Sequence, residues 1–135
     1  MLLSLFFKLI MRDILVKAKN IDSPKEWIVG VPQYNWVGKE GLELQEIKNT
    51  LGNAYNIEKE TVCQFTGLKD SKKNDIFEND IIEITYEGES ATKWVVYFNK
   101  IMGVYRLKMF SGHGERMIFP LNERAVVVGN IKDLN

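Results

Sequence analysis

The sequence is poor in the residues that most often build catalytic and metal sites. Its 135 residues include one cysteine, Cys63, and one histidine, His113. One cysteine excludes a disulfide within the chain, and a zinc site made of thiolates would need ligands that the chain lacks. His113 has neither a nucleophile nor an orienting group beside it in the sequence. We therefore expect no enzyme activity and no cofactor or metal.

The chain also lacks net charge. Lysine and arginine together number 18, and so do aspartate and glutamate, so no overall field attracts nucleic acid or an anionic membrane. The apolar run in MLLSLFFKLI, residues 1–10, is far shorter than the ~20 residues of a membrane-spanning helix, and no basic region precedes it as in a signal peptide. We expect a cytoplasmic globular protein with no membrane partner.

Residues 1–10 need a separate interpretation. Met11 followed by Arg12 looks like an initiation point, so we interpret residues 1–10 as an extension from an upstream start. A segment as apolar as residues 1–10 is ordered only where it packs on its own domain or on a neighbouring chain. The expected packing indicates a homo-oligomer, although an unknown protein partner could also cover residues 1–10.

Short segments with alternating or β-branched residues dominate the rest, and no window keeps a helical period. Proline lacks a backbone donor, so Pro32 should lie at the edge or end of a strand, and residues 34–41 read as a turn-rich link. The pattern predicts a mainly β protein, with a small antiparallel barrel or strongly bent sheet in its C-terminal half. The expected strands are residues 13–19, 27–31, 42–47, 61–65, 81–87, 91–99, 104–110 and 125–131.

Residues 64–82, QFTGLKDSKKNDIFENDII, are the part richest in turn residues. We expect the chain to turn at Thr66 and Gly67, then to form a solvated loop, and then a tight corner at residues 78–80. Asn tolerates the left-handed conformation better than most residues, so Asn79 should have a positive φ there. The residues expected to form this structural junction are Thr66, Gly67, Asp70, Ile76, Phe77, Asn79 and Asp80.

The same stretch permits two functional hypotheses. Clustered carboxylates such as Asp70, Asp75 and Asp80 can hold Mg²⁺ for phosphoryl chemistry, which would suit a metal-dependent hydrolase. Acidic residues also cap turns, and the interleaved lysines favour that structural interpretation.

The second hypothesis is a weak nucleic-acid-binding regulator. Lysines contact phosphates and aromatic rings stack on bases, so the candidate binding surface combines a basic loop with exposed aromatics. Acidic neighbours and the zero net charge argue for a solvated loop instead. The candidate binding residues are Lys69, Lys72, Lys73, Tyr34 and Trp36.

Residues 61–82, TVCQFTGLKDSKKNDIFENDII, resemble the signature of the YopX family of phage and prophage proteins. Residues 127–131, VVGNI, are similar to the family's closing V-[IV]-G-N-I, and residues 11–14 to its common Met-Arg-x-Ile start. The family usually has glycine where this chain has Asn79, which suits a corner with positive φ. Residues 1–10 have no counterpart in the family.

The resemblance covers residues 11–135. It implies a C-terminal SH3-like barrel, residues 61–135, after an N-terminal β-rich lobe, residues 11–60, and a biochemical role that is uncharacterised. Taken with the residues, it favours a non-enzymatic, phage-derived accessory protein, which we expect to be a self-associating β-barrel interaction module.

Overall fold

The computed structural model describes residues 15–36 and 38–134, without the side chains of Trp36 and Glu40. The chain divides into two compact units, Met1–Phe65 and Thr66–Asn135, each with its own core. Residues 1–10, for which we expected an apolar contact, lie outside the described residues. Antiparallel strands dominate both units, so the expected mainly β class is confirmed.

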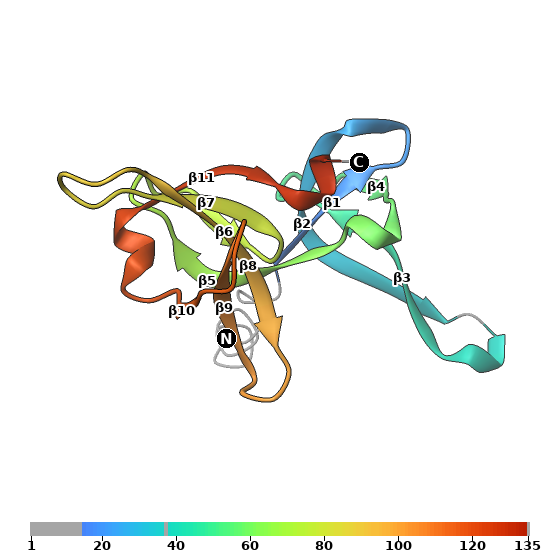
Figure 1. Cartoon of the computed structure of the whole chain (residues 1–135). Coiled ribbons are helices and arrows are strands. Elements are labelled where there is room, and N and C mark those ends of the chain that lie inside the picture. The colour runs from blue at the N-terminus through green and yellow to red at the C-terminus, as the bar shows by residue number, and fades with distance from the viewer. Residues whose placement is uncertain (1–14, 37, 135) are drawn as a thin grey trace, which may run out of the picture. The chain divides into compact units, whose positions relative to one another are not determined.

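The first unit is an antiparallel sheet with strand order β4-β3-β2-β1, and the beginning of β5 pairs with β1 (Figure 1). Two short 3-10 helices, η1 and η2, connect its strands. Its elements are β1 (Val16–Asn20), β2 (Ser23–Trp36), η1 (Gly38–Glu40), β3 (Leu42–Lys48), β4 (Ala54–Asn56), η2 (Lys59–Thr61) and β5 (Cys63–Lys69).

The core of the first unit follows from alternation along these strands. On β1, Val16 and Ala18 are buried, while the alternating residues Lys17 and Lys19 are not. The buried residues that pack together are Val16, Ala18, Ile28, Ile47 and Ile57, with Leu44, Tyr55 and Val62 against them.

Strand β2 is longer than its sequence predicts. We expected a strand over residues 27–31 and a turn after Pro32, but β2 continues through Pro32 to Trp36. Among the described residues, β1 accompanies β2 only as far as Gly30, and beyond it β2 pairs with β3 alone. None of the described strands therefore pairs with Pro32 on the side of β1, where a missing backbone donor costs no ladder bond.

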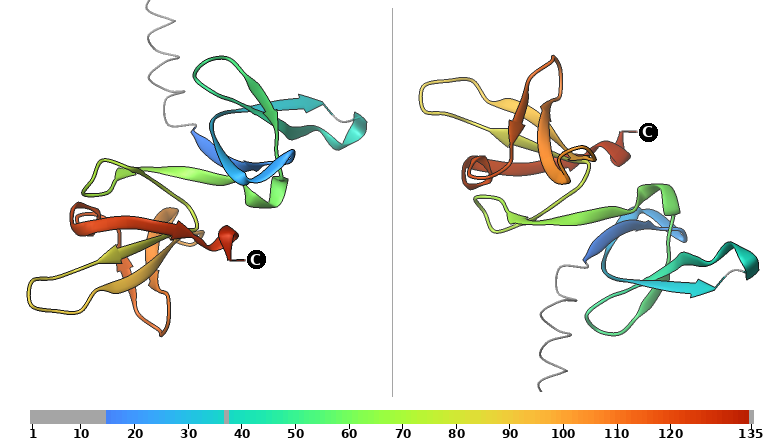
Figure 2. Two further views of the ribbon diagram at one scale, coloured as in Figure 1. Left: turned by 90° about the horizontal axis from the view of Figure 1, so that it is seen from above. Right: turned by 90° about the horizontal axis from the view of Figure 1, so that it is seen from below.

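The second unit contains a five-stranded antiparallel sheet with strand order β10-β9-β8-β7-β11. Both views in Figure 2 show its β8–β9 hairpin, in orange, extending away from the other strands of the unit. Its elements are β6 (Asp75–Phe77), β7 (Asp80–Ile84), β8 (Thr92–Asn99), β9 (Val104–Met109), β10 (Glu115–Met117), η3 (Leu121–Arg124), β11 (Ala125–Asn130) and η4 (Ile131–Asp133).

One face of this sheet forms the second core. Ile82 on β7 lies opposite Trp94 on β8, and Val96 on β8 lies opposite Leu107 on β9. Because side chains alternate across a strand, these positions share one face and bury it together. The buried set is Ile76, Ile82, Ile84, Trp94, Val96, Leu107, Ile118 and Ala125.

The sheet does not close into the barrel that we expected. Among the described residues, β10 and β11 are its two edges. The loop between β5 and β6 covers the outer edge of β11: the amide of Ser71 donates to the carbonyl oxygen of Ala125, at 2.9 Å, and the amide of Val127 donates to the Asp70 carboxylate. These loop contacts take the place of a further strand on this edge of the sheet.

Strand β5 also differs from expectation, because the chain does not turn at Thr66 and Gly67. The strand continues through both residues to Lys69. Gly67 has a φ of 86°, which allows a local bend without ending the strand. Thr66 Oγ1 donates to the carbonyl oxygen of Ile76 at 2.7 Å and accepts from the amide of Leu68 at 3.2 Å, which ties the bend to β6.

Candidate interaction surface

The loop after β5 is built around the carboxylate of Asp70. Oδ1 accepts hydrogen bonds from the amides of Lys72 and Asn74, both at 2.9 Å. Oδ2 accepts from the amide of Val127 at 3.0 Å and from the side chain of Asn74 at 3.2 Å. Burial by itself raises the pKa of the Asp70 carboxyl, but these hydrogen bonds outweigh it and hold the pKa below its ordinary value of 3.8.

The corner before β7 uses a second buried carboxylate in the same manner. Asp80 Oδ2 accepts from the amide of Phe77 at 2.8 Å, and Oδ1 accepts from the side chain of Asn130 at 2.9 Å. Asn79 has a φ of 70°, the left-handed conformation expected at this corner. Ile76 and Phe77, just before the corner, are buried. The carboxylates of Asp70 and Asp80 are thus occupied by structural hydrogen bonds.

The acidic residues of the junction do not form the hypothetical magnesium site. Asp75 pairs with Lys69 at 2.8 Å instead of approaching another carboxylate. No three His, Cys, Asp or Glu side chains of the described residues are grouped so that they could hold a metal ion. The observed arrangement is the turn chemistry that was the alternative to metal binding.

The five candidate binding residues come from both units. Lys69, Lys72 and Lys73 lie on or beside the loop in the second unit, and all three are exposed. Tyr34 is exposed on β2 in the first unit, and the side chain of Trp36 is outside the described part of the chain. Lys69 and Lys73 border a polar hollow of about 470 Å³.

Trp27, Tyr97 and Trp94 offer little free surface for base stacking. Lys17 and Lys19 lie over Trp27, 4.9 and 5.5 Å from the ring centroid, and Lys108 lies over Tyr97 at 5.4 Å. Trp94 is buried in the second core. These contacts give the nucleic-acid hypothesis no particular support.

The most distinctive surface was not anticipated from the sequence. An apolar groove of about 410 Å³ opens beside the β8–β9 turn in the second unit. Met117 and Phe119 on its wall are 63% and 61% exposed, so the groove presents large apolar side chains to solvent. The residues that give the apolar groove its character are Leu68, Met102, Val104, Met117, Ile118 and Phe119.

The β8–β9 turn holds further apolar side chains out to solvent. Asn99 Oδ1 accepts from the amides of Ile101 and Met102, both at 3.0 Å, so the turn is well defined. Ile101 is almost fully exposed. Turns normally carry polar residues, so the dipeptide Ile-Met between two strands was the one signal in the sequence for this surface.

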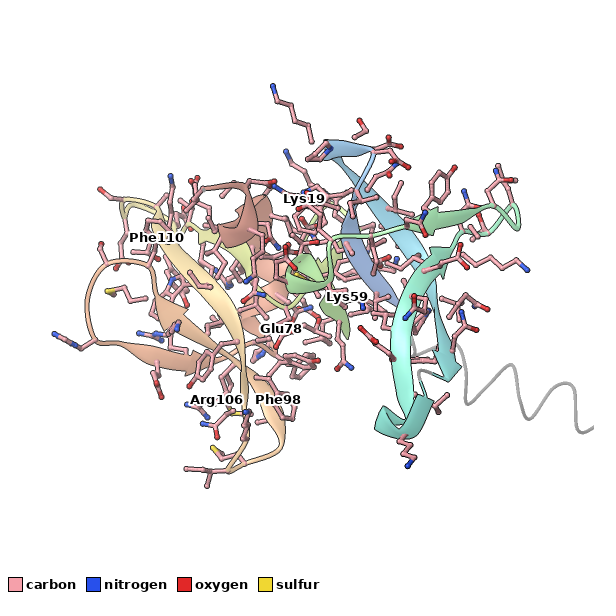
Figure 3. The ribbon with its side chains drawn as sticks, turned by 90° about the vertical axis from the view of Figure 1, so that its right-hand side faces the viewer. Lys19, Lys59, Glu78, Phe98, Arg106 and Phe110 are labelled. Atoms are coloured by element: carbon pink, nitrogen blue, oxygen red, sulfur yellow. The ribbon has the colours of Figure 1, made fainter. Side chains whose placement is uncertain are left out.

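Arg106 is the sole charged side chain among the described residues that line the apolar groove. Its Nη1 lies 3.6 Å from Met102 Sδ, a weak acceptor, and its Nε is buried without a hydrogen-bond partner. Tyr97, its neighbour across the β8–β9 pair, has a hydroxyl that is likewise buried and unpartnered. Figure 3 shows Arg106 and Phe98 on this hairpin, toward its turn, with Phe110 at the opposite end of β9.

Comparisons with known proteins identify one family. A family model described as YopX protein matches residues 21–133, nearly the whole chain. A search of curated proteins finds no match. In the part of the chain that the structure describes, no helix has the length and apolar character needed to cross a membrane.

Proposed function

The chain belongs to the YopX family, and we propose that this member is a non-enzymatic accessory protein of phage or prophage origin that acts as a self-associating interaction module. The apolar groove and the neighbouring β8–β9 turn are its contact surface. The junction has a structural role in the second unit.

The observation that carries the proposal is the concentration of exposed apolar side chains around one groove. Isolated apolar residues on a surface need no explanation, but a contiguous patch marks an interaction site because water contact with it is unfavourable. Two of its residues, Met102 and Met117, have flexible side chains that adapt to a partner's shape. The turn that displays Ile101 and Met102 is pre-formed, which lowers the entropy cost of binding.

A non-enzymatic role is consistent with the chemistry of the junction. Asp70 and Asp80 accept hydrogen bonds from backbone and amide groups, so neither carboxylate is placed to act as a base or a nucleophile. The side chain of Cys63 is buried and contacts the carbonyl oxygen of Thr61 at 3.2 Å. The strongly patterned residues are used for structure, and the apolar groove is left for recognition.

Multi-angle light scattering over a range of protein concentrations tests self-association. We expect the full chain to exceed its monomer mass of 15.6 kDa, and the Val104→Lys variant to approach it, because the new charge would be buried in the contact. Val29→Lys is the matched control, since Val29 on β2 is 41% exposed and Val104 is 43% exposed.

A shortened chain that starts at Met11 shows separately whether residues 1–10 contribute to association. If the full chain and the shortened chain are both monomeric at every concentration, self-association is wrong. If Val29→Lys weakens association as much as Val104→Lys does, the contact is not at the apolar groove.

A further inference from the structure

The position of Arg106 restricts how copies of the chain can meet. In a two-fold symmetric contact between two grooves, each Arg106 would enter the same apolar interface as its counterpart. Burial of two Arg106 guanidinium groups together, with no acidic side chain between them, is strongly unfavourable. The apolar groove therefore suits a different surface of the second copy, one that brings an apolar side chain together with a carboxylate.

Three exposed large apolar residues of the described chain have an acidic neighbour in the sequence: Ile21, Leu42 and Leu134. Glu43, beside Leu42, already pairs with Lys59, and Asp133, beside Leu134, is engaged in a contact within its own chain. Asp22, beside Ile21, is exposed and has no ion-pair partner among the described residues. The Ile21–Asp22 turn is thus the best source of both groups.

The turn between β1 and β2 holds these two residues firmly. The amide of Ile21 donates to the carbonyl oxygen of Asn56, and the amide of Asp22 donates to Asn20 Oδ1, both at 3.0 Å. Ile21 is 53% exposed despite these anchors. A rigid turn that presents an apolar side chain and a carboxylate loses little conformational entropy when it binds.

We propose that copies associate head to tail, with the Ile21–Asp22 turn of one copy in the apolar groove of the next. Ile21 packs among the methionine and phenylalanine side chains of the groove, and the Asp22 carboxylate accepts hydrogen bonds from the Arg106 guanidinium. This inference rests on the self-association proposed above and specifies its two surfaces. Because each copy carries one groove and one turn, such contacts either close into a ring or continue as an open chain of copies.

A charge-exchange experiment tests the pairing. In Arg106→Glu and in Asp22→Arg, like charges face each other in the contact, so association should weaken about tenfold or more in each variant alone. In an equimolar mixture the native pair and the reversed pair are both complementary, so the larger assemblies should return. Recovery in the mixture also shows that both variants are folded. The measurement is again molar mass by light scattering.

Two controls carry the same charge changes at exposed positions that belong neither to the lining of the groove nor to the Ile21–Asp22 turn. Lys93→Glu on β8 and Glu60→Arg on η2 should associate as the unchanged chain does. A monomeric unchanged chain overturns self-association itself. Association that persists in Arg106→Glu overturns the head-to-tail inference alone.

The two remaining outcomes are equally decisive. If both variants are monomeric and the mixture stays monomeric, Arg106 and Asp22 do not meet. If Asp22→Arg associates normally while Arg106→Glu does not, the groove receives a different segment and the assignment of the turn is wrong.

Discussion

The carboxylate of Asp70 accepts a hydrogen bond from the backbone amide of Val127, 57 residues later in the chain. This contact joins the loop between β5 and β6 to the outer edge of β11. An exposed strand edge is a template for unwanted pairing, and native proteins commonly cover such edges with loops. Asp70 therefore stabilises the loop and protects the edge of the sheet at once.

Replacement of Asp70 should destabilise the second unit. Asp70→Ala leaves the partly buried hydrogen bonds from the amides of Lys72, Asn74 and Val127 without their acceptor. We expect a loss of about 3 kcal/mol or more in the free energy of unfolding. Asp70→Asn keeps the shape and some acceptor capacity and should cost about 1–3 kcal/mol. Urea denaturation measures both. Asp75→Asn, which removes only an exposed pair with Lys69, should cost less than about 1 kcal/mol, and an equal loss there would contradict this account.

The depressed pKa of Asp70 predicts sensitivity to acid. In the folded chain the carboxyl has a pKa below 3.8, its ordinary value, which we take for the unfolded chain. A lowered folded pKa adds stability that is fully present above the unfolded pKa and is lost as the pH falls through the folded pKa. The free energy of unfolding should therefore begin to drop as the pH falls to about 4. Asp70→Asn lacks this titration, so the difference in stability between the two proteins should shrink in acid; a constant difference would refute the assignment.

Part of the second unit could be predicted from the sequence, because local chemistry determines it. Alternation indicated β7 and β9, aromatic content indicated β8, and turn propensity indicated the positive φ of Asn79. Predictions from local residue preferences were wrong where contacts between distant parts of the chain determine the structure. The chain was expected to turn at Gly67. Instead, the positive φ of Gly67 only bends β5, and the strand continues because Thr66 forms a hydrogen bond with Ile76 on β6.

The groove could not be predicted for a related reason. It combines side chains from β5, β9 and the segment after β10, such as Leu68, Val104 and Phe119, and no single stretch contains its pattern. The Ile101–Met102 pair in a turn gave a local hint. The unpartnered Nε of Arg106 depends on which side chains surround it in space, so it becomes visible only in the folded chain.

Substitution at Asn79 should separate backbone strain from side-chain contacts. Its φ of 70° is favourable for glycine and costs other residues roughly 1–2 kcal/mol. We expect Asn79→Ala to lower the free energy of unfolding by about 1 kcal/mol, and Asn79→Gly to change it by only a few tenths. The backbone bonds of Asn79 to Val96 and Ile131 persist in both variants and so do not account for a difference. A larger loss in Asn79→Gly than in Asn79→Ala would show that the side chain matters more than φ.

Gly30 should be intolerant of any side chain. A Cβ at this position would overlap the carbonyl oxygen of Lys48 and lie 2.9 Å from Cγ2 of Ile47 on the neighbouring β3. We expect Gly30→Ala to cost about 1–3 kcal/mol, because the β2–β3 pair must separate. At Gly114, the nearest atom to an added Cβ is 3.6 Å away in Trp94, an ordinary contact. Gly114→Ala should therefore be nearly neutral in thermal denaturation, and equal effects at both positions would contradict the argument.

Phe77 tests whether residues 64–82 form a structural junction or a binding surface. Phe77 is 4% exposed just before the corner at Asn79. Truncation of a buried phenylalanine leaves a cavity as well as losing hydrophobic transfer energy, so Phe77→Ala should cost about 3–5 kcal/mol in urea denaturation. Phe119→Ala removes the same atoms from an exposed position and should cost less than about 1 kcal/mol.

If self-association follows the groove, the two variants should show opposite patterns: Phe119→Ala should weaken association with little loss of stability, whereas Phe77→Ala should lose stability first. A nearly neutral Phe77→Ala would return the stretch to the candidate binding surfaces.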